Sequence, residues 1–201
     1  MRLGIDLDGV VYDFDKVARD TFLTRSLPEP LTESQRYKLH RPALGWDGLG
    51  ETVGKANWGW LWQNAQDLKI FDRLAPIPGA IEALRELIQE HDVYMVTTRP
   101  KGVEDQTYRF LAAYSLRPKG VFHSSDKSQI AKALSLAVVV DDGPENLKNY
   151  LLRTRGALKG IRIYGVKAPW NERSGIETSY YRFQWVDHLR DVLDDVRELA
   201  A

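Results

Sequence analysis

Short apolar runs alternate along the chain with segments in which apolar residues recur every three or four positions. The runs have the length and β-branched content of buried strands, and the periodic segments are typical of amphipathic helices. Strands that alternate with helices form a mostly parallel sheet covered on both faces, so the pattern predicts an α/β fold of about five strands. The predicted strands are residues 3–5, 93–96, 120–122, 137–140 and 161–164, and the predicted helices are residues 13–25, 80–90, 104–116, 127–136, 144–155 and 186–199.

Residues 26–75 interrupt this alternation. The segment opens with Pro28 and Pro30, is polar and irregular, and is rich in tryptophan. Prolines and glycine-bearing stretches break regular structure. We interpret the segment as a small, mainly helical insertion that lies outside the sheet.

Two carboxylates follow the first predicted strand. Asp6 and Asp8 come directly after the apolar residues 3–5, and Gly9 follows them. Side chains two positions apart on an extended segment point the same way, so both carboxylates converge at the carboxyl end of the strand, where open α/β sheets bind ligands. Converging carboxylates repel unless a cation or a shared proton lies between them, and Mg²⁺ suits such oxygen ligands. Taken alone, the pair would more often be turn residues that cap the next segment.

Two more strand ends carry polar side chains. Thr97 and Thr98 follow the second strand, and Asp141 and Asp142 follow the fourth. Lys127 begins the helix between them. Because parallel strands open on the same edge of a sheet, we expect these residues to gather beside the first acidic pair. Each is more often structural when it occurs alone, but together they supply a carboxylate nucleophile, hydroxyl donors, a cation and an acidic pair for a metal ion.

These residues belong to four short segments, residues 5–10 (IDLDGV), 96–98 (VTT), Lys127 and 138–142 (VVVDD). The segments resemble the four motifs of the haloacid-dehalogenase (HAD) superfamily of phosphohydrolases. More narrowly, the chain is similar to the 5′(3′)-deoxyribonucleotidase family, which also has Asp-Gly-Val in place of Asp-Gly-Thr. Further shared features are Asp13-Phe14, residues 76–80 (PIPGA) and residues 169–171 (PWN).

The resemblance implies an architecture and a set of roles. A Rossmann-like core would comprise residues 1–14 and 75–201, with residues 15–74 as a helical cap. Asp6 would attack phosphorus to form a phosphoaspartyl intermediate, and Asp8 would act as the general acid and base. Phosphoryl oxygens would be held by Thr97, Thr98 and Lys127. The implied Mg²⁺ ligands are Asp6, Asp8 through its backbone carbonyl, and Asp141 and Asp142 directly or through water, and which of the last two binds the ion directly stays open.

Three other residues are candidate substrate contacts. A cap excludes water and supplies contacts that separate substrates. Trp58 and Trp62 share one face of a helix, and a ring stacked on a base would contribute about 1–3 kcal/mol. The alternative, which we favour for most of the tryptophans, is that they fill the core of the cap. Arg99 follows the threonine pair and is either an extra phosphate or base contact or a solvated arginine at a strand end.

The amino-acid composition excludes several further classes of function. The 201 residues contain 28 Lys and Arg, 28 Asp and Glu, and no cysteine. The balanced charge argues against bulk attraction to nucleic acid or to an anionic membrane, and the absence of cysteine excludes thiol catalysis and cysteine–zinc sites. No secretory or membrane-spanning pattern occurs, so we expect a soluble, cytoplasmic protein without a stable nucleic-acid complex.

The leading interpretation is a Mg²⁺-dependent phosphomonoesterase for nucleoside monophosphates, with deoxyribonucleotides favoured. One alternative is a phosphatase for another small phosphate ester or for a 3′-phosphate at a nucleic-acid end. The balanced charge counts against the nucleic-acid substrate, because phosphate contacts dominate such binding. Another is a nucleotide-binding regulator without turnover, which would need neither Asp6 nor Asp8. A homodimer is compatible with each interpretation.

Overall fold

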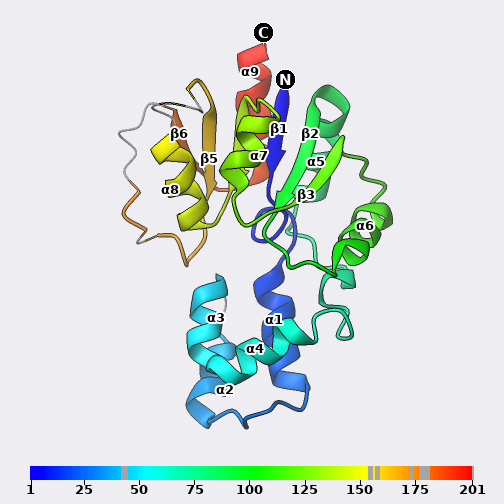
Figure 1. Ribbon diagram of the computed structural model, residues 1–201, viewed down its shortest axis with the longest axis vertical. Coiled ribbons are helices and arrows are strands. Elements are labelled where there is room, and N and C mark those ends of the chain that lie inside the picture. The colour runs from blue at the N-terminus through cyan, green and yellow to red at the C-terminus, as the bar shows by residue number, and fades with distance from the viewer. Residues whose placement is uncertain (42–44, 154–155, 157–158, 173, 177–181, 201) are drawn as a thin grey trace.

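The structure is a computed structural model that describes residues 1–41, 45–153, 156, 159–172, 174–176 and 182–200. One sheet of six strands, all parallel, forms its centre in the order β3-β2-β1-β4-β5-β6 (Figure 1). This confirms the predicted α/β class. The strand order reverses between β1 and β4, which is the switch point where open α/β sheets bind ligands. The strands are β1 (Arg2–Ile5), β2 (Asp92–Thr97), β3 (Gly120–His123), β4 (Val138–Asp141), β5 (Arg162–Val166) and β6 (Phe183–Val186).

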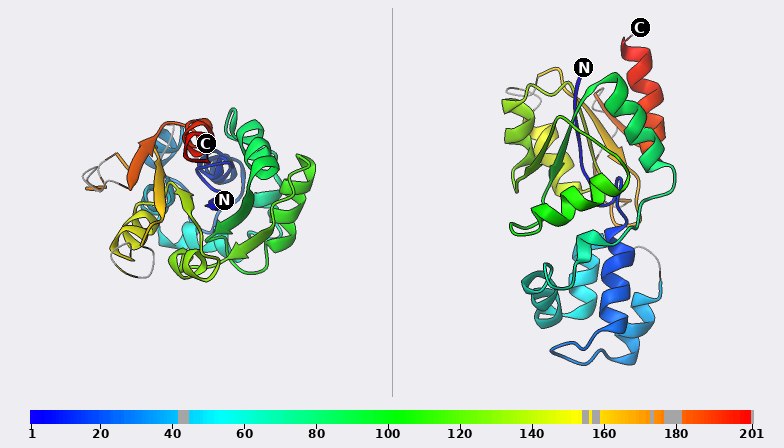
Figure 2. Two further views of the ribbon diagram at one scale, coloured as in Figure 1. Left: turned by 90° about the horizontal axis from the view of Figure 1, so that it is seen from above. Right: turned by 90° about the vertical axis from the view of Figure 1, so that its right-hand side faces the viewer.

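Helices cover both faces of the sheet (Figure 2). α5 and α9 pack against each other on one face, and α7 and α8 pack against each other on the opposite face. Each presents an apolar stripe to the strands, which explains why their periodic sequences were readable as helices. No helix within the described ranges is long and apolar enough to cross a bilayer. These helices, with the neighbouring α6, are α5 (Ala80–Glu90), α6 (Glu104–Ala113), α7 (Lys127–Ala133), α8 (Pro144–Arg153) and α9 (Leu189–Ala200).

The predicted insertion is helical, and it lies at the carboxyl edge of the sheet rather than on either face (Figure 1). α3 contacts α1, α2 and α4, so the four helices form one group. The fully buried side chains of Phe22, Leu39 and Leu61 lie inside this group. Its members are α1 (Phe14–Thr24), α2 (Glu33–Leu39), α3 (Gly45–Val53) and α4 (Lys55–Gln63), and a 3₁₀ turn, η1 (Ile70–Asp72), follows.

The C-terminal part differs from the prediction. The pattern predicts a helix over residues 186–199 and no strand between it and the fifth strand at residues 161–164, whereas the structure has a sixth strand, β6, and starts α9 at Leu189. β6 is a four-residue edge strand in which only Phe183 and Val186 are buried while Gln184 is exposed. The apolar run is therefore too short and too broken to indicate a buried strand.

Two chain segments connect the sheet to the group of helices α1–α4. The outgoing segment, residues 9–13, leaves β1, and the returning segment, residues 70–77, leads back to α5. The backbone N–H of Asp13 donates to the carbonyl of Ala75 at 2.8 Å, and the Tyr12 hydroxyl donates to a backbone carbonyl of the returning segment. These bonds tie the two segments together beside the carboxyl ends of β1 and β2.

Candidate active site

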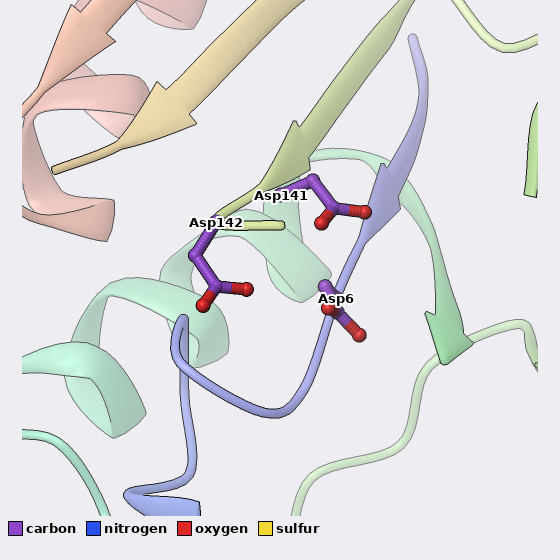
Figure 3. Close-up of side chains that lie close together, drawn as sticks. All are labelled: Asp6, Asp141 and Asp142. Carbon is purple, nitrogen blue, oxygen red and sulfur yellow. The ribbon is translucent and has the colours of Figure 1, made fainter. Parts of the chain in front are cut away.

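Three carboxylates meet where β1 and β4 end. Asp6 follows β1, and Asp141 and Asp142 end β4 and begin the loop after it. The parallel register pairs Ile5 with Val140, so the two strands end level with each other. Figure 3 shows the three side chains close together at the ends of the two strands, and each offers an oxygen within 4.8 Å of the others. The structure thus brings together acidic residues that lie about 135 positions apart in the sequence.

Lys127 lies between two of these carboxylates. Its Nζ is 2.6 Å from Asp6 Oδ2 and 2.8 Å from Asp141 Oδ2, and the side chain is buried. Asp126 caps the start of α7 by accepting the backbone N–H of Gln129, which places the lysine at the first helical position. Burial alone would lower the pKa of Lys127, but the two carboxylates outweigh it and hold the pKa above its ordinary value. The residue is therefore a fixed cation.

Asp8 pairs with Arg99. The guanidinium donates from Nε to Asp8 Oδ2 at 2.9 Å and from Nη2 to Asp8 Oδ1 at 2.8 Å, and both residues are buried. A solvated position for this arginine, one of the alternatives from the sequence, is therefore wrong. Asp8 and Arg99 are 91 residues apart in the sequence, and no local sequence pattern predicts that they pair.

The site holds more negative than positive charge. Among the residues that the structure describes, its two cations are Lys127 and Arg99, so two of the four carboxylates lack a balancing charge from that part of the chain. Burial raises the pKa of Asp6 to about 7, against the opposing effect of Lys127 and with further upward contributions from neighbouring carboxylates. Burial also raises the pKa of Asp142 well above its ordinary value. Bound protons neutralise the excess negative charge of the carboxylates when no other cation is present, and a divalent cation would replace those protons. The four carboxylates are Asp6, Asp8, Asp141 and Asp142, called the carboxylate cluster below.

Asp142 is held by residues that follow β5. Trp170 donates its indole Nε1–H to Asp142 Oδ2 at 2.9 Å, and Asn171 donates Nδ2 to the Asp142 backbone carbonyl at 2.9 Å. Gly9 makes room for this carboxylate, because a Cβ there would lie 2.0 Å from Asp142 Oδ2 and the glycine has φ +79°. The sequence pointed to residues 169–171 as a family feature but assigned them no place in the site.

The carboxylate oxygens of the two adjacent aspartates are used differently. Asp141 accepts Lys127 on Oδ2, and on Oδ1 it accepts the Gly143 N–H at 2.9 Å and Asn146 Nδ2 at 3.1 Å. Asp142 Oδ1 has no hydrogen bond from the part of the chain that the structure describes. Hard, negatively charged oxygens converge here, which is the ligand type that Mg²⁺ takes. The residues present therefore fit a Mg²⁺ ion.

A cavity of about 340 Å³ opens in front of the cluster. Asp6 and Asp8 lie in its wall, Gly48 of α3 borders it from the side of the helical group, and Trp170 contributes an aromatic wall. Thr98 is exposed and lines the cavity, whereas Thr97 is fully buried and its hydroxyl accepts the Arg99 N–H at 3.2 Å. Of the two threonines, Thr98 presents its side chain to the cavity. The other lining residues are Asp142, Gly143, Pro144, Glu145 and Asn146.

Trp58 and Trp62 pack among other aromatic rings. Trp62 stacks on Phe14 at 5.4 Å between ring centroids and on Phe71 at 6.5 Å, and Trp58 meets Trp62 edge to face at 5.1 Å. Neither ring is among the residues that line the 340 Å³ cavity. This placement supports the interpretation that both rings fill the core of the helical group.

Comparisons with known proteins identify the family of the chain. Residues 1–164 match the sequence model of the family described as 5′ nucleotidase, deoxy (pyrimidine), cytosolic type C protein (NT5C). A Bacillus cereus protein named "Putative nucleotidase" is 25% identical over 122 residues, which are 58% of this chain and 61% of that protein. The chain therefore spans about three fifths of the length of this curated relative.

Solved structures share the fold. The haloacid dehalogenase-like hydrolase SP0104 from Streptococcus pneumoniae superimposes with a TM-score of 0.64 at 16% identity, and 97% of each chain is covered. The magnesium-bound "putative HAD-hydrolase YfnB" from Bacillus subtilis gives a TM-score of 0.63 at 18% identity, and 98% of each chain is covered. Both are similar to this chain over the sheet and the inserted helices alike.

Proposed function

The chain belongs to the cytosolic type C 5′ nucleotidase family, and from that premise we propose that it hydrolyses the phosphate ester of a pyrimidine deoxyribonucleoside monophosphate. One observation supports the proposal above the others. A buried carboxylate, Asp6, forms part of the cavity wall while a buried cation, Lys127, holds its second oxygen. This arrangement orients a nucleophile and neutralises charge at the same point, and those two effects supply most of the rate in phosphoryl transfer.

The proposed reaction has two steps. An Asp6 oxygen forms a bond to phosphorus while the bond from phosphorus to the ester oxygen breaks, and Asp8, which must carry a proton in this step although it is an anion in the resting site, gives that proton to the leaving oxygen. Asp8 then takes a proton from water, whose oxygen attacks phosphorus and releases Asp6 and inorganic phosphate. Lys127 and the Thr98 hydroxyl hold phosphoryl oxygens through both steps, and the cavity between the sheet and α3 encloses the substrate.

Mg²⁺ fits the excess charge of the site. Four carboxylates against two cations leave two negative charges, which equals the charge of one Mg²⁺ ion. We propose that, of the two adjacent aspartates, Asp142 binds it directly, because Asp142 Oδ1 is open, whereas both oxygens of Asp141 already accept hydrogen bonds. Asp6, whose oxygens accept the Leu7 N–H and Lys127, would share one of them with the ion. When bound, the ion would neutralise phosphoryl oxygens as charge develops on them.

The proposed function is tested by a substrate screen. Purified protein is incubated with Mg²⁺ and with deoxyribonucleoside 5′- and 3′-monophosphates, ribonucleotides, sugar phosphates and p-nitrophenyl phosphate, and released phosphate is measured. We expect turnover of nucleotides with pyrimidine deoxyribonucleotides preferred. Preference for a sugar phosphate would replace the nucleotide by another small ester, and no release from any ester would refute the proposal.

Metal binding should depend on pH in a defined direction. Below about pH 7 the Asp6 carboxyl holds a proton that Mg²⁺ must displace, and the raised pKa of Asp142 adds a second one, so affinity should fall at least about tenfold for each pH unit below that point. Calorimetric titration at pH 6, 7 and 8 measures this. Without Mg²⁺, the raised pKa adds stability at acid pH that is lost as the pH rises through about 7. An affinity that stays constant from pH 6 to 8 would contradict the expectation.

The indole of Trp170 should strengthen metal binding without touching the ion. Trp170→Phe keeps an aromatic wall but removes the N–H that orients Asp142 Oδ2. Residues that hydrogen-bond to metal ligands and orient them typically contribute about 10–100-fold to affinity. We therefore expect the Mg²⁺ dissociation constant to rise by about that factor in Trp170→Phe. Trp60→Phe, in the helical group, is the matched control. Equal affinities in both variants would show that the hydrogen bond plays no such part.

A further inference from the structure

We propose that Arg99 is a positioning residue, which fixes the Asp8 carboxylate at the cavity wall so that it can exchange protons with the leaving oxygen and with water. The inference rests on the proposed function, since it assigns a part in that reaction. The Arg99 guanidinium forms a fork that meets both oxygens of Asp8, at 2.9 and 2.8 Å. A bidentate fork fixes the plane of a carboxylate as well as its place, which a single ion pair does not.

One further hydrogen bond and two aromatic rings hold the guanidinium. Its third nitrogen, Nη1, donates to Thr107 Oγ1 of α6 at 3.1 Å. The ring centroids of Phe71 and Tyr12 lie 4.2 and 4.8 Å from its Cζ, which are distances of cation–π contact. The Arg99 side chain has no exposed surface, so water cannot take the place of any of these partners.

The two rings belong to different connections between the sheet and the inserted helices. Tyr12 lies in the outgoing segment and Phe71 in the returning segment, and the Arg99 guanidinium contacts both rings. The backbone N–H of Phe71 donates to Gln106 Oε1 at 2.9 Å, and Gln106 is a buried residue of α6. Arg99 is thus fixed by the same elements that attach the helical group to the core.

This geometry separates Arg99 from a phosphate-binding residue. Each of the three guanidinium nitrogens, Nε, Nη1 and Nη2, donates to Asp8 or Thr107, and Arg99 is not among the residues that line the 340 Å³ cavity. Asp8 does line that cavity. The arginine therefore reaches the reaction through the carboxylate that it holds.

The leaving group distinguishes the two roles in kinetics. A nucleotide releases an alkoxide, which needs a proton, whereas p-nitrophenolate leaves without one. The ratio kcat/KM reports the steps up to phosphoaspartyl formation. We expect Arg99→Met to lower kcat/KM for thymidine 5′-monophosphate by about 10²–10³-fold, within the usual range for a general acid, and to change it less than about threefold for p-nitrophenyl phosphate.

A double-mutant cycle with Asp8→Asn gives the second measurement. If Arg99 acts through Asp8, then Arg99→Met should cause no further loss in the Asp8→Asn background. Arg109→Met is the matched control, because Arg109 also forms a fork to a carboxylate, Asp72 beside Phe71, but is exposed. We expect that control to keep wild-type values for both esters.

Three outcomes would overturn the inference. Equal losses for both esters, or losses that multiply with Asp8→Asn, would mean that Arg99 contacts the phosphoryl group itself. No loss for either ester would make the ion pair purely structural. If Arg99→Met does not fold, Arg99→Lys keeps the cation without the fork and should show the same selective loss, of about tenfold or more. Absence of turnover by the wild-type protein for either ester would count against the proposed function instead.

Discussion

We expect the Asp6→Asn variant to release no phosphate while it stays folded. An amide cannot form the acyl phosphate, so we expect kcat to fall by at least about 10⁴-fold, the scale seen when a nucleophile is removed. The amide oxygen can still accept the Leu7 N–H that now donates to Asp6 Oδ1 at 2.7 Å. Released phosphate and a thermal melt of the same sample measure both parts of the prediction.

The control for this variant lies seven residues along the chain. Asp13 caps α1 by accepting the Lys16 N–H, and asparagine caps helices equally well. Asp13→Asn should therefore keep full activity and an unchanged melting temperature. Substantial turnover by a folded Asp6→Asn protein would rule out Asp6 as the nucleophile and, with it, the two-step reaction.

Lys127→Met has the second large effect, and it acts on stability as well as on rate. Removing the buried cation leaves Asp6 and Asp141 without their shared partner. Breaking a buried ion pair from one side destabilises a protein by about 3–5 kcal/mol, which corresponds to about 6–20 °C in Tm for a chain of this size. Mg²⁺ should restore part of this loss because it supplies positive charge to the same carboxylates.

The loss of rate in Lys127→Met should not depend on the leaving group. The ammonium faces the transferring phosphoryl group in the proposed reaction, so nucleotides and p-nitrophenyl phosphate should both lose about 10³–10⁵-fold. This differs from the selective loss expected for Arg99→Met. Lys132→Met, an exposed lysine on the same helix, is the control and should match the wild type. A loss confined to one kind of ester would move Lys127 away from the phosphoryl group.

The sequence was most informative where one local pattern decides the structure. Apolar runs such as residues 138–140 become central strands because they are buried on both faces, and the acidic residues after them must then lie at the carboxyl edge of the sheet. The convergence of Asp6, Asp141 and Lys127 follows from that rule together with parallel register. Predicting this convergence required only that the strands be parallel neighbours in one sheet. It required no detail of side-chain packing.

The sequence was least informative where side chains from separate loops decide the structure. The fork between Arg99 and Asp8 depends on two rings in the connecting segments and on Thr107 of α6, and no periodic pattern encodes such a contact. Trp170 reaches Asp142 from a loop after β5 for the same reason. The strand β6 was missed because it is short and half exposed at the edge of the sheet.

The central position of β1 also affects how the chain folds during its synthesis on the ribosome. β1 is the first strand to be synthesised, yet its two neighbours are β2 and β4, and β4 begins about 130 residues later. At about 5–20 residues per second, the first strand waits about 7 to 27 s for its second partner. During that interval one edge of Leu3–Ile5 has no strand to pair with, so a nascent chain of fewer than about 140 residues exposes an apolar edge that chaperones and other nascent chains can bind.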